Sequence, residues 1–347
     1  MHVLTVRDVN EALPRALAYL RDCGKPEQTR NGPALVAPGP VATVYREPQR
    51  RVLFDAERDA NPFFHLFESL WILAGRRDVR FLSWFNSRIA DYSDDGKVFH
   101  APYGFRLRHA FNGTDQLQAV ARQLRTDPNS RRAVLQIWNA GLDLNVTSKD
   151  LPCNLMVLPR VRDGVLDITV CNRSNDAVWG AYGANAVQFS FIQEYLAHMI
   201  GCCIGEYTQM SHNLHVYTDN PYWQAWRAEQ PAGVHVPECP YDDHGEDGFG
   251  PDPSPLIVEG ESIEQFDNDL ADFFRETEYG HMASANDLDR AIKEGKIEFS
   301  TKFFKWIVIP MLDAFVHRSW RDLDIDYDWH AAGSEWVLRR FAKKVTP

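Results

Sequence analysis

Residues 151–176 read LPCNLMVLPRVRDGVLDITVCNRSND and decide how the middle of the chain folds. The segments 154–161 and 165–172 are apolar and rich in β-branched residues, and the Arg-Asp-Gly stretch at 162–164 between them is a turn signal. The sequence therefore predicts two strands joined by a tight turn. Pro159 has no backbone N–H, which places the first strand at an edge or gives it a bulge.

The cysteine that precedes the first of these strands is the first candidate for chemistry. Cys153 could be a buried apolar filler, because free cysteines are commonly buried. However, Arg131, Arg132 and Arg173 flank neighbouring predicted strands and could surround an anion, although adjacent arginines are usually a solvated face. An arginine near a thiol increases its thiolate fraction. This combination favours a nucleophilic cysteine.

Two polar clusters follow this cysteine. The run 172–185 (NRSNDAVWGAYGAN) is rich in turn formers, and taken alone it predicts a strand-to-helix connection with Asn185 as the helix N-cap. In the run 211–217 (SHNLHVY), His215 and Tyr217 share one face of a predicted strand. These two side chains are either structural partners across strands or ligands of a sugar hydroxyl.

Bulk properties exclude several classes of protein. The 347 residues carry a net charge of -11, with a pI of about 5.5, which disfavours DNA binding and other polyanion partners. Six cysteines show neither CxxC pairs nor Cys/His spacing for a metal, so we expect no metal and reduced thiols in the cytoplasm. No apolar run is long enough to span a membrane.

The remaining pattern predicts an α/β (α+β) protein. Apolar periodicity predicts helices at 7–22, 61–75, 115–125 and 186–201, a loop at 24–40, and strands at 41–54, 133–138 and 206–217. After a stretch rich in Pro, Gly and acid at 229–256, further helices are predicted at 262–277, 284–294 and 301–319, with a break near Pro310. We therefore expect an α/β core up to about residue 228, followed by a linker and helical extension, 229–347.

The order of the polar clusters resembles the thymidylate synthase family. That family has a Pro-Cys-His strand, then Arg-Ser-x-Asp, a Gly-to-Asn stretch that opens a long helix, and a His-x-Tyr pair. The corresponding residues here are Pro152-Cys153, Arg173-Ser174-Asn175-Asp176, Gly180 with Asn185, and His215-Val216-Tyr217. The stretch 127–132, Tyr103-Gly104, Glu68 in FESLW and Arg30 also resemble family positions, and the resemblance covers about residues 15–220.

The resemblance implies the thymidylate synthase fold, with a mixed sheet packed by helices, in a catalytic domain at 1–228. It also implies a homodimer and transfer of one carbon from 5,10-methylenetetrahydrofolate to C5 of a pyrimidine nucleotide. Adding a thiolate at C6 makes C5 nucleophilic, which is covalent catalysis. The implied catalytic residues are Cys153, Glu68, Tyr103 and Asp176. The implied nucleotide-binding residues are Arg30, Arg131, Arg132, Arg173, Ser174, Asn175, Asn185, His215 and Tyr217, with Arg131 and Arg132 reaching across the dimer interface. Asp176, Gly180 and Ile89 would contact folate.

The chain departs from the family pattern at several positions. Asn154 and Asn172 replace a histidine and a glutamine, Ile89 stands near a family tryptophan, and 180–185 is longer by one residue, so that Ala184 competes with Asn185 for the base-reading position. The stretch 339–347 also replaces the short apolar tail that closes over folate.

If water is poorly excluded from the site, it adds to the last intermediate and gives a hydroxymethyl product. We therefore expect a dUMP 5-hydroxymethylase, similar to virus-encoded enzymes that make precursors of modified DNA, because an amide at position 185 favours dUMP. The alternatives are a dCMP or CMP hydroxymethylase, a methylating thymidylate synthase, and a non-catalytic nucleotide-binding or RNA-binding relative.

Overall fold

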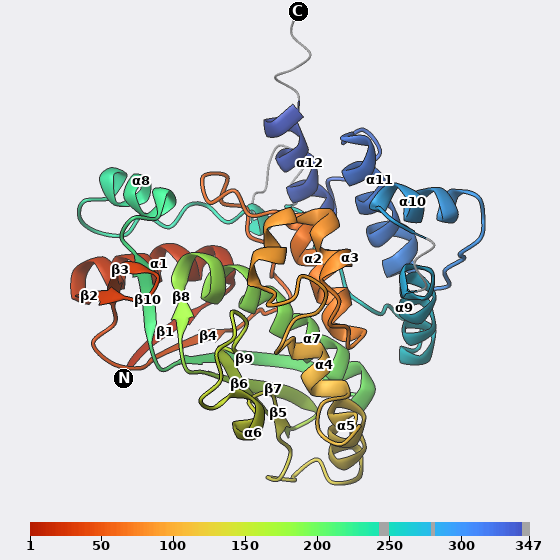
Figure 1. Ribbon diagram of the computed structural model, residues 1–347, viewed down its shortest axis with the longest axis horizontal. Helices are drawn as coiled ribbons and strands as arrows, with labels where there is room; N and C mark the ends of the chain where they lie inside the picture. The colour runs from red at the N-terminus through yellow and green to blue at the C-terminus, as the bar shows by residue number, and fades with distance from the viewer. Residues whose placement is uncertain (243–249, 279–281, 342–347) are drawn as a thin grey trace, which may run out of the picture. The chain divides into compact units, whose positions relative to one another are not determined.

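The computed structural model describes residues 1–242, 250–278 and 282–341 (Figure 1). By its contacts the chain divides into two compact units. The first comprises Met1–Ala60, Thr114–Asn145 and Pro152–Asp243, and the second comprises Asn61–Gly113, Val146–Leu151 and His244–Pro347. The first unit contains both β-sheets, whereas the second is built from helices. The division of function at residue 228 remains a prediction.

A six-stranded mixed sheet forms the centre of the first unit, and its strand order is β1-β4-β9-β7-β6-β5. The strands are β1 (His2–Val6), β4 (Val41–Tyr45), β5 (Leu135–Gln136), β6 (Asn154–Arg162), β7 (Val165–Asn172) and β9 (Cys203–Ser211). The pairs β1·β4 and β7·β9 are parallel, and the other pairs are antiparallel. The prediction of a mixed sheet is confirmed.

The predicted β6–β7 hairpin is also confirmed. Asp163 and Gly164 both have positive φ, 48° and 76°, as a two-residue turn between right-twisted strands requires. The register of β6 against β7 shifts between Asn154 and Met156, which is a bulge at the start of β6. Pro159 lies beyond the short reach of β5, so β6 is an edge strand at that point.

A second sheet of four strands corrects the prediction of a loop at 24–40. This segment forms the hairpin β2 (Lys25–Thr29) and β3 (Gly32–Val36), and β3 pairs with β10 (Leu214–Tyr217), which pairs with β8 (Asn175–Asp176). The Gly and Pro residues were misleading, because β2 is an exposed edge strand and tolerates Pro26. The β2–β3 hairpin is stabilised by the pairing of β3 with β10, which is distant in sequence, so the local sequence does not indicate it.

The prediction of one strand at 206–217 is also wrong. The chain forms β9 and β10 there, in different sheets, with His212 and Asn213 between them. Both residues make backbone hydrogen bonds. The N–H of His212 donates to the carbonyl of Asn172 (2.9 Å), and the carbonyl of Asn213 accepts from the N–H of Asn175 (2.8 Å). The break therefore carries the chain from one sheet to the other beside the residues that follow β7.

Three helices of the first unit follow their predicted positions: α1 (Val9–Cys23), α5 (Gln116–Thr126) and α7 (Ala186–Ile200). The sequence did not predict α6 (Ala140–Asp143) or α8 (Pro221–Glu229). Almost every residue of α7 is buried, including Glu194, whose carboxylate pairs with the buried guanidinium of Arg51. A charge can be buried at this depth only because it is paired.

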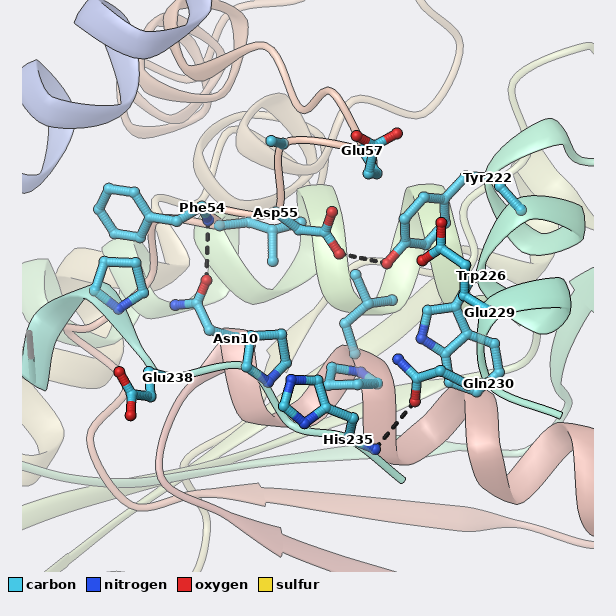
Figure 2. Close-up of a pocket in the computed structure, with 17 residues that line it drawn as sticks. Asn10, Phe54, Asp55, Glu57, Tyr222, Trp226, Glu229, Gln230, His235 and Glu238 are labelled. Atoms are coloured by element: carbon cyan, nitrogen blue, oxygen red, sulfur yellow. Dashed lines mark hydrogen bonds between the residues drawn. The ribbon is translucent and has the colours of Figure 1, made fainter. Parts of the chain in front are cut away.

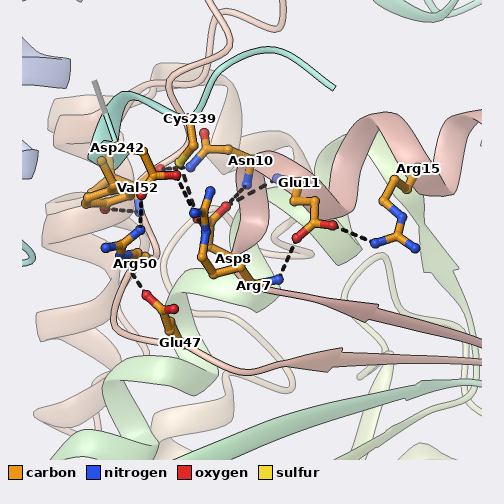
Figure 3. Close-up of polar contacts among 11 residues, drawn as sticks. Arg7, Asp8, Asn10, Glu11, Arg15, Glu47, Arg50, Val52, Cys239 and Asp242 are labelled. Carbon is orange, nitrogen blue, oxygen red and sulfur yellow. Dashed lines mark hydrogen bonds and ion pairs between the residues drawn. The ribbon is translucent and has the colours of Figure 1, made fainter. Parts of the chain in front are cut away.

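A cluster of polar contacts fixes the start of α1 (Figure 3). The buried carboxylate of Asp8 caps the helix by accepting from the N–H groups of Asn10 (2.9 Å) and Glu11 (3.2 Å). It also accepts from Sγ of Cys239 (3.2 Å), and Asp242 pairs with Arg7 and Arg50. These contacts hold the segment around 239–242 against the N-terminal region of the same unit.

The second unit is helical. Its helices are α2 (Pro62–Leu73), α3 (Val79–Phe85), η1 (Ser87–Tyr92), α4 (Tyr103–Arg108), α9 (Ile263–Glu278), α10 (Ala285–Lys293), η4 (Phe303–Val308), α11 (Ile309–His317) and α12 (Asp328–Phe341). The break near Pro310 is confirmed as the change from a π-helical segment to α11. The sequence did not predict α3, α4 or α12. In the described parts of the chain, no helix has the length and apolarity needed to cross a bilayer.

Gly104 allows α4 to pack directly on the backbone of α2. A Cβ at this position would overlap the carbonyl group of Ile72. We expect Gly104→Ala to destabilise the protein by about 1–3 kcal/mol, as overpacking usually does, and to lower the thermal unfolding midpoint. A Cβ at Gly39 would meet no atom within 4 Å, and the φ of this glycine is not positive, so Gly39→Ala is the matched control. Equal midpoints for the two variants would contradict this packing.

Candidate active site

The ends of the β6–β7 hairpin bring Cys153 and Arg173 together. The backbone N–H of Arg173 donates to the carbonyl of Cys153 (2.9 Å), and its Nε donates to the carbonyl of Pro152 (2.9 Å). Both side chains are half-buried, and the Arg173 guanidinium also lies 6.0 Å from the ring centroid of Trp138. The backbones of Cys153 and Arg173 are therefore fixed side by side where β6 begins and β7 ends.

Buried asparagines surround the next positions. Asn154 and Asn172 face each other across β6 and β7 and are hydrogen-bonded, and Asn154 Nδ2 also donates to Asn185 Oδ1 (3.1 Å). Asn185 Nδ2 donates to Asn175 Oδ1 (3.0 Å). Asn154 and Asn172 are both departures from the family pattern. Asn154 contacts Asn185 directly, and Asn172 is linked to Asn185 through Asn154.

A π-helix explains how Asn185 reaches this position despite the extra residue. The segment η2 (Ala177–Asn185) has wide turns, which absorb one residue more than an α-helix of the same rise. A Cβ at Gly180 would lie 2.8 Å from Asn175 Oδ1, so this position needs glycine. Asn185, at 5% exposure, belongs to the polar network, and no hydrogen bond joins that network to Ala184 among the described residues.

Asp176 and His215 lie opposite each other where β8 pairs with β10. The Asp176 carboxylate accepts from the N–H groups of Val178 (3.3 Å) and Trp179 (3.0 Å) at the start of η2. Burial raises the pKa of Asp176, although these N–H groups and the charges of His215 and Arg58 oppose the rise. The carboxyl group is therefore suited to exchange a proton nearer neutral pH than a free aspartate.

The predicted sugar-binding pair lies next to the turn that carries Arg30. The rings of His215 and Tyr217 pack edge to face, with centroids 5.1 Å apart. Asn31 Nδ2 donates to Tyr217 Oη (3.2 Å), which brings the β2–β3 turn to this face. Arg30 itself is exposed at the tip of that turn.

Arg131 and Arg132 are exposed after α5, just beyond the buried Ser130. Ser174 is half-buried between Arg173 and Asn175. The structure thus collects Cys153 and most predicted nucleotide-binding residues in the first unit, while Arg131 and Arg132 remain available at its surface.

Three predicted residues belong to the second unit. Glu68 is half-buried on α2, Tyr103 begins α4, and Ile89 lies in η1. The helices α2 and α4 pack closely through Gly104, so Glu68 and Tyr103 lie on adjoining helices.

Arg58 and Trp179 were not predicted as site residues. The guanidinium of Arg58 lies 4.3 Å from the ring centroid of Trp179, and its Nε donates to the carbonyl of Val178 (2.8 Å). Its terminal nitrogens are buried and have no hydrogen-bond partner among the described residues, and Gly183 leaves the room they occupy. The Trp179 side chain is 61% exposed. Trp179 directly precedes Gly180, which the sequence analysis named as a site residue, so it could have been identified from the sequence. No local sequence pattern indicates Arg58.

A pocket of about 320 Å³ lies elsewhere in the first unit, between α1, α8 and the segment 235–240 (Figure 2). Its lining includes the apolar residues Leu13, Phe54 and Trp226 and the acidic residues Asp55, Glu57, Glu229 and Glu238. It contains none of the predicted site residues.

In the second unit, Asp289, Asp313 and His317 bring possible metal ligands within 4.8 Å of one another. Nζ of Lys293 contacts all three side chains. An ammonium group therefore takes the position that a metal ion would need. The expectation of no metal in this protein stays a prediction.

Taken together, the first unit carries a half-buried cysteine, an arginine and a polar group of Asn, Asp and His residues on a mixed sheet. Comparison with known proteins specifies the family. A family model described as thymidylate synthase matches residues 62–232.

Named relatives agree with this match. A deoxyuridylate hydroxymethyltransferase of Pseudomonas phage M6 is 40% identical over 362 aligned residues, covering 99% of this chain and 95% of the relative. One of Bacillus phage SP01 is 46% identical over 52% of this chain and 50% of its own length, and one of Delftia phage PhiW-14 is 29% identical over 62% of each. The chain belongs to the thymidylate synthase family, whose members are one-carbon transferases.

Thiol reactivity tests the burial of the two cysteines where β9 begins. Cys202 and Cys203 are adjacent, but Cys202 is half-buried and Cys203 is exposed. Burial raises the pKa of Cys202 to about 11. At about pH 8, roughly one Cys202 in a thousand is then a thiolate. We expect a disulfide reagent to modify Cys203 much faster than Cys202, so Cys203→Ser should remove a fast-reacting thiol and Cys202→Ser should not. Equal rates at the two positions would contradict the burial.

Proposed function

We propose that this protein is a deoxyuridylate hydroxymethyltransferase, which converts dUMP to 5-hydroxymethyl-dUMP as a precursor of modified DNA. The observation that carries the proposal is the placement of Cys153 beside Arg173 in a chain that resembles a phage enzyme of that name over nearly its full length. The family supplies the one-carbon chemistry. The choice of nucleotide and product is the proposal.

In the proposed mechanism, the Cys153 thiolate forms a bond to C6 of the pyrimidine, which makes C5 nucleophilic. Arg173 and Ser174 hold the 5′-phosphate through charge-assisted hydrogen bonds. His215 and Tyr217 bind the deoxyribose hydroxyl. Glu68, Tyr103 and Asp176 move protons, and a carboxyl group whose pKa burial raises is suited to that role.

The residues near Asp176 fit a folate. The exposed indole of Trp179, held from below by Arg58, offers a flat surface for an aromatic ring, and the Asp176 carboxyl lies at the start of the same π-helix. Methylenetetrahydrofolate supplies the one-carbon unit when bound. Gly180 would also contact the folate, and Trp179 is a further candidate. The family resemblance assigns Ile89, in the second unit, to folate as well.

Hydroxymethylation requires water to reach the last intermediate, whereas methylation requires its exclusion and a hydride. The stretch 339–347, which motivates the hydroxymethyl product, is described only as far as 341, and residues 342–347 lie outside the described residues. The names of the three phage relatives support the same product. Their origin also supports a virus-encoded protein that acts in the cytoplasm of its host.

Product analysis tests the proposal. With dUMP and methylenetetrahydrofolate, we expect a nucleotide heavier by CH2O and no dihydrofolate. Cys153→Ala should reduce turnover on the order of 10⁴-fold or more, because it removes the nucleophile. Cys202→Ala changes another half-buried thiol and should keep full turnover.

Other outcomes have distinct meanings. A gain of CH2 with dihydrofolate formation would identify a methylating thymidylate synthase, which the matching family model favours as the second candidate. Turnover of dCMP or CMP alone would overturn the choice of dUMP. Absence of tritium release from C5-labelled nucleotides would indicate a non-catalytic relative.

A homodimer with Arg131 and Arg132 acting across the interface is part of the proposal, and their exposure in the single chain supports it. Arg131→Ala and Cys153→Ala proteins should each be nearly inactive. After mixing and subunit exchange, about a quarter of all sites should combine an intact cysteine with an intact arginine from the partner chain. If the mixture stays inactive while exchange is demonstrated by size or label, Arg131 acts within its own chain or not at all.

A further inference from the structure

The pocket between α1, α8 and the segment 235–240, here called the α1–α8 pocket, carries unbalanced negative charge. Four of its 17 lining residues are acidic, and none is a lysine or an arginine. Glu57, Glu229 and Glu238 form no ion pair with the described residues, and they lie on different sides of the pocket (Figure 2). The charge lining this pocket therefore favours a cation and disfavours an anion.

The nearby arginines do not balance the three glutamates. Arg21 lies behind the pocket and pairs with Asp22 (2.6 Å). The charge of Arg58 acts on Asp55, whose carboxylate also accepts from the backbone N–H of Arg58 (2.9 Å) and from the hydroxyl of Tyr222. The fourth acidic side chain of the pocket is therefore satisfied by its protein neighbours, and the uncompensated charge belongs to the glutamates.

Apolar surface makes up much of the remaining lining. Leu13 and Leu53 are 0% and 7% exposed, yet both border the pocket, as do Phe54 and Trp226. The volume of about 320 Å³ lies at the lower end of the range of ligand pockets. A cavity of about 150 Å³ holds one benzene ring, so the α1–α8 pocket has room for a ring with a short side chain.

Two hydrogen-bond donors of the lining have no partner among the described residues. Trp226 is only 7% exposed, but its indole N–H makes no hydrogen bond, whereas a buried indole N–H usually has a partner. Gln230 accepts from the N–H of His235 (3.0 Å) through Oε1, and its Nε2 donates to no described residue. Figure 2 shows the indole nitrogen and this amide next to each other. One acceptor, such as a hydroxyl oxygen, can satisfy both donors.

We propose that the α1–α8 pocket binds a small organic amine that also carries a hydroxyl group. The protonated amino group faces the unpaired glutamates, and the hydroxyl oxygen accepts from Trp226 and Gln230. The apolar body of the ligand packs against Leu13 and Phe54. This site is separate from the candidate active site, because none of the predicted site residues lines the pocket.

Tyramine is the probe, and two analogues each lack one of the proposed contacts. Tyrosol has a neutral hydroxyl in place of the amino group, and phenethylamine lacks the phenol hydroxyl. Dissociation constants are measured by calorimetry, without nucleotide or folate, at about pH 7.5, where an alkylamine is charged. We expect tyramine to bind about 10-fold more tightly than tyrosol and about 3–10-fold more tightly than phenethylamine. Raising the ionic strength from about 0.05 to about 0.5 M should weaken the binding of tyramine and leave that of tyrosol unchanged.

Substitutions locate the binding within the pocket. Ala225 is exposed on α8 and lines the pocket, so Ala225→Phe should fill it and weaken tyramine binding about 10-fold or more. Ala228 is exposed on the same helix outside the lining, and Ala228→Phe is the matched control. Glu229→Gln combined with Glu238→Gln should weaken tyramine about 3–10-fold without changing the binding of tyrosol. Glu27→Gln, on the exposed strand β2, controls for the change in overall charge.

The hydroxyl contact has its own test, because Trp226→Phe keeps an aromatic ring and removes only the indole N–H donor. This variant should reduce the advantage of tyramine over phenethylamine.

The proposal is overturned if tyrosol binds wild-type protein as tightly as tyramine, or if Ala225→Phe and Ala228→Phe bind tyramine equally. Unfolding midpoints identify a variant that fails to fold. If Ala225→Phe does not fold, the double glutamine variant decides, because it changes only two exposed side chains. Tighter binding of α-N-acetyl-lysinamide than of tyramine would overturn the choice of a free amine in favour of a basic side chain from a partner protein.

Discussion

The hydrogen bond from the backbone of Arg173 to the carbonyl of Cys153 is the contact on which the site depends. It exists because the turn at 163–164 folds β6 back on β7, so that the residue before one strand meets the residue after the other. Two groups separated by a hairpin thus become neighbours at the edge of the sheet. This pairing fixes the backbones of both residues and hence the positions from which their side chains start.

The same edge receives residues from the second sheet and from η2. Asp176 belongs to β8 and also caps η2, so the pairing of β8 with β10 sets both the carboxyl group and the start of the π-helix. The wide turns of η2 then carry Asn185 to the buried amides. An inserted residue would rotate every later side chain of an α-helix by about 100°, so a π-helix keeps the following residue in place where an α-helix would not.

Local signals predicted the parts of the fold that are themselves local. Asp-Gly at 163–164 forms the expected turn, and the helix expected at 61–75 forms as α2 (Pro62–Leu73). The hairpin at 25–36 was missed because β2 is exposed and its order comes from β10, far along the chain. The break between β9 and β10 was missed because both strands are apolar enough to read as one.

The sequence by itself determined which chemical groups are present and in what order: Cys153, then Arg173 to Asp176, Asn185, and His215 with Tyr217. That order, with the hairpin, was sufficient to identify the family. Only the tertiary structure decided that Asn154 contacts Asn185, 31 positions away, and that Arg58 lies beneath Trp179. Contacts of this kind depend on how strands pair and how a π-helix packs on them, and the free energy of burying each amide or guanidinium is set by neighbours that no local pattern records.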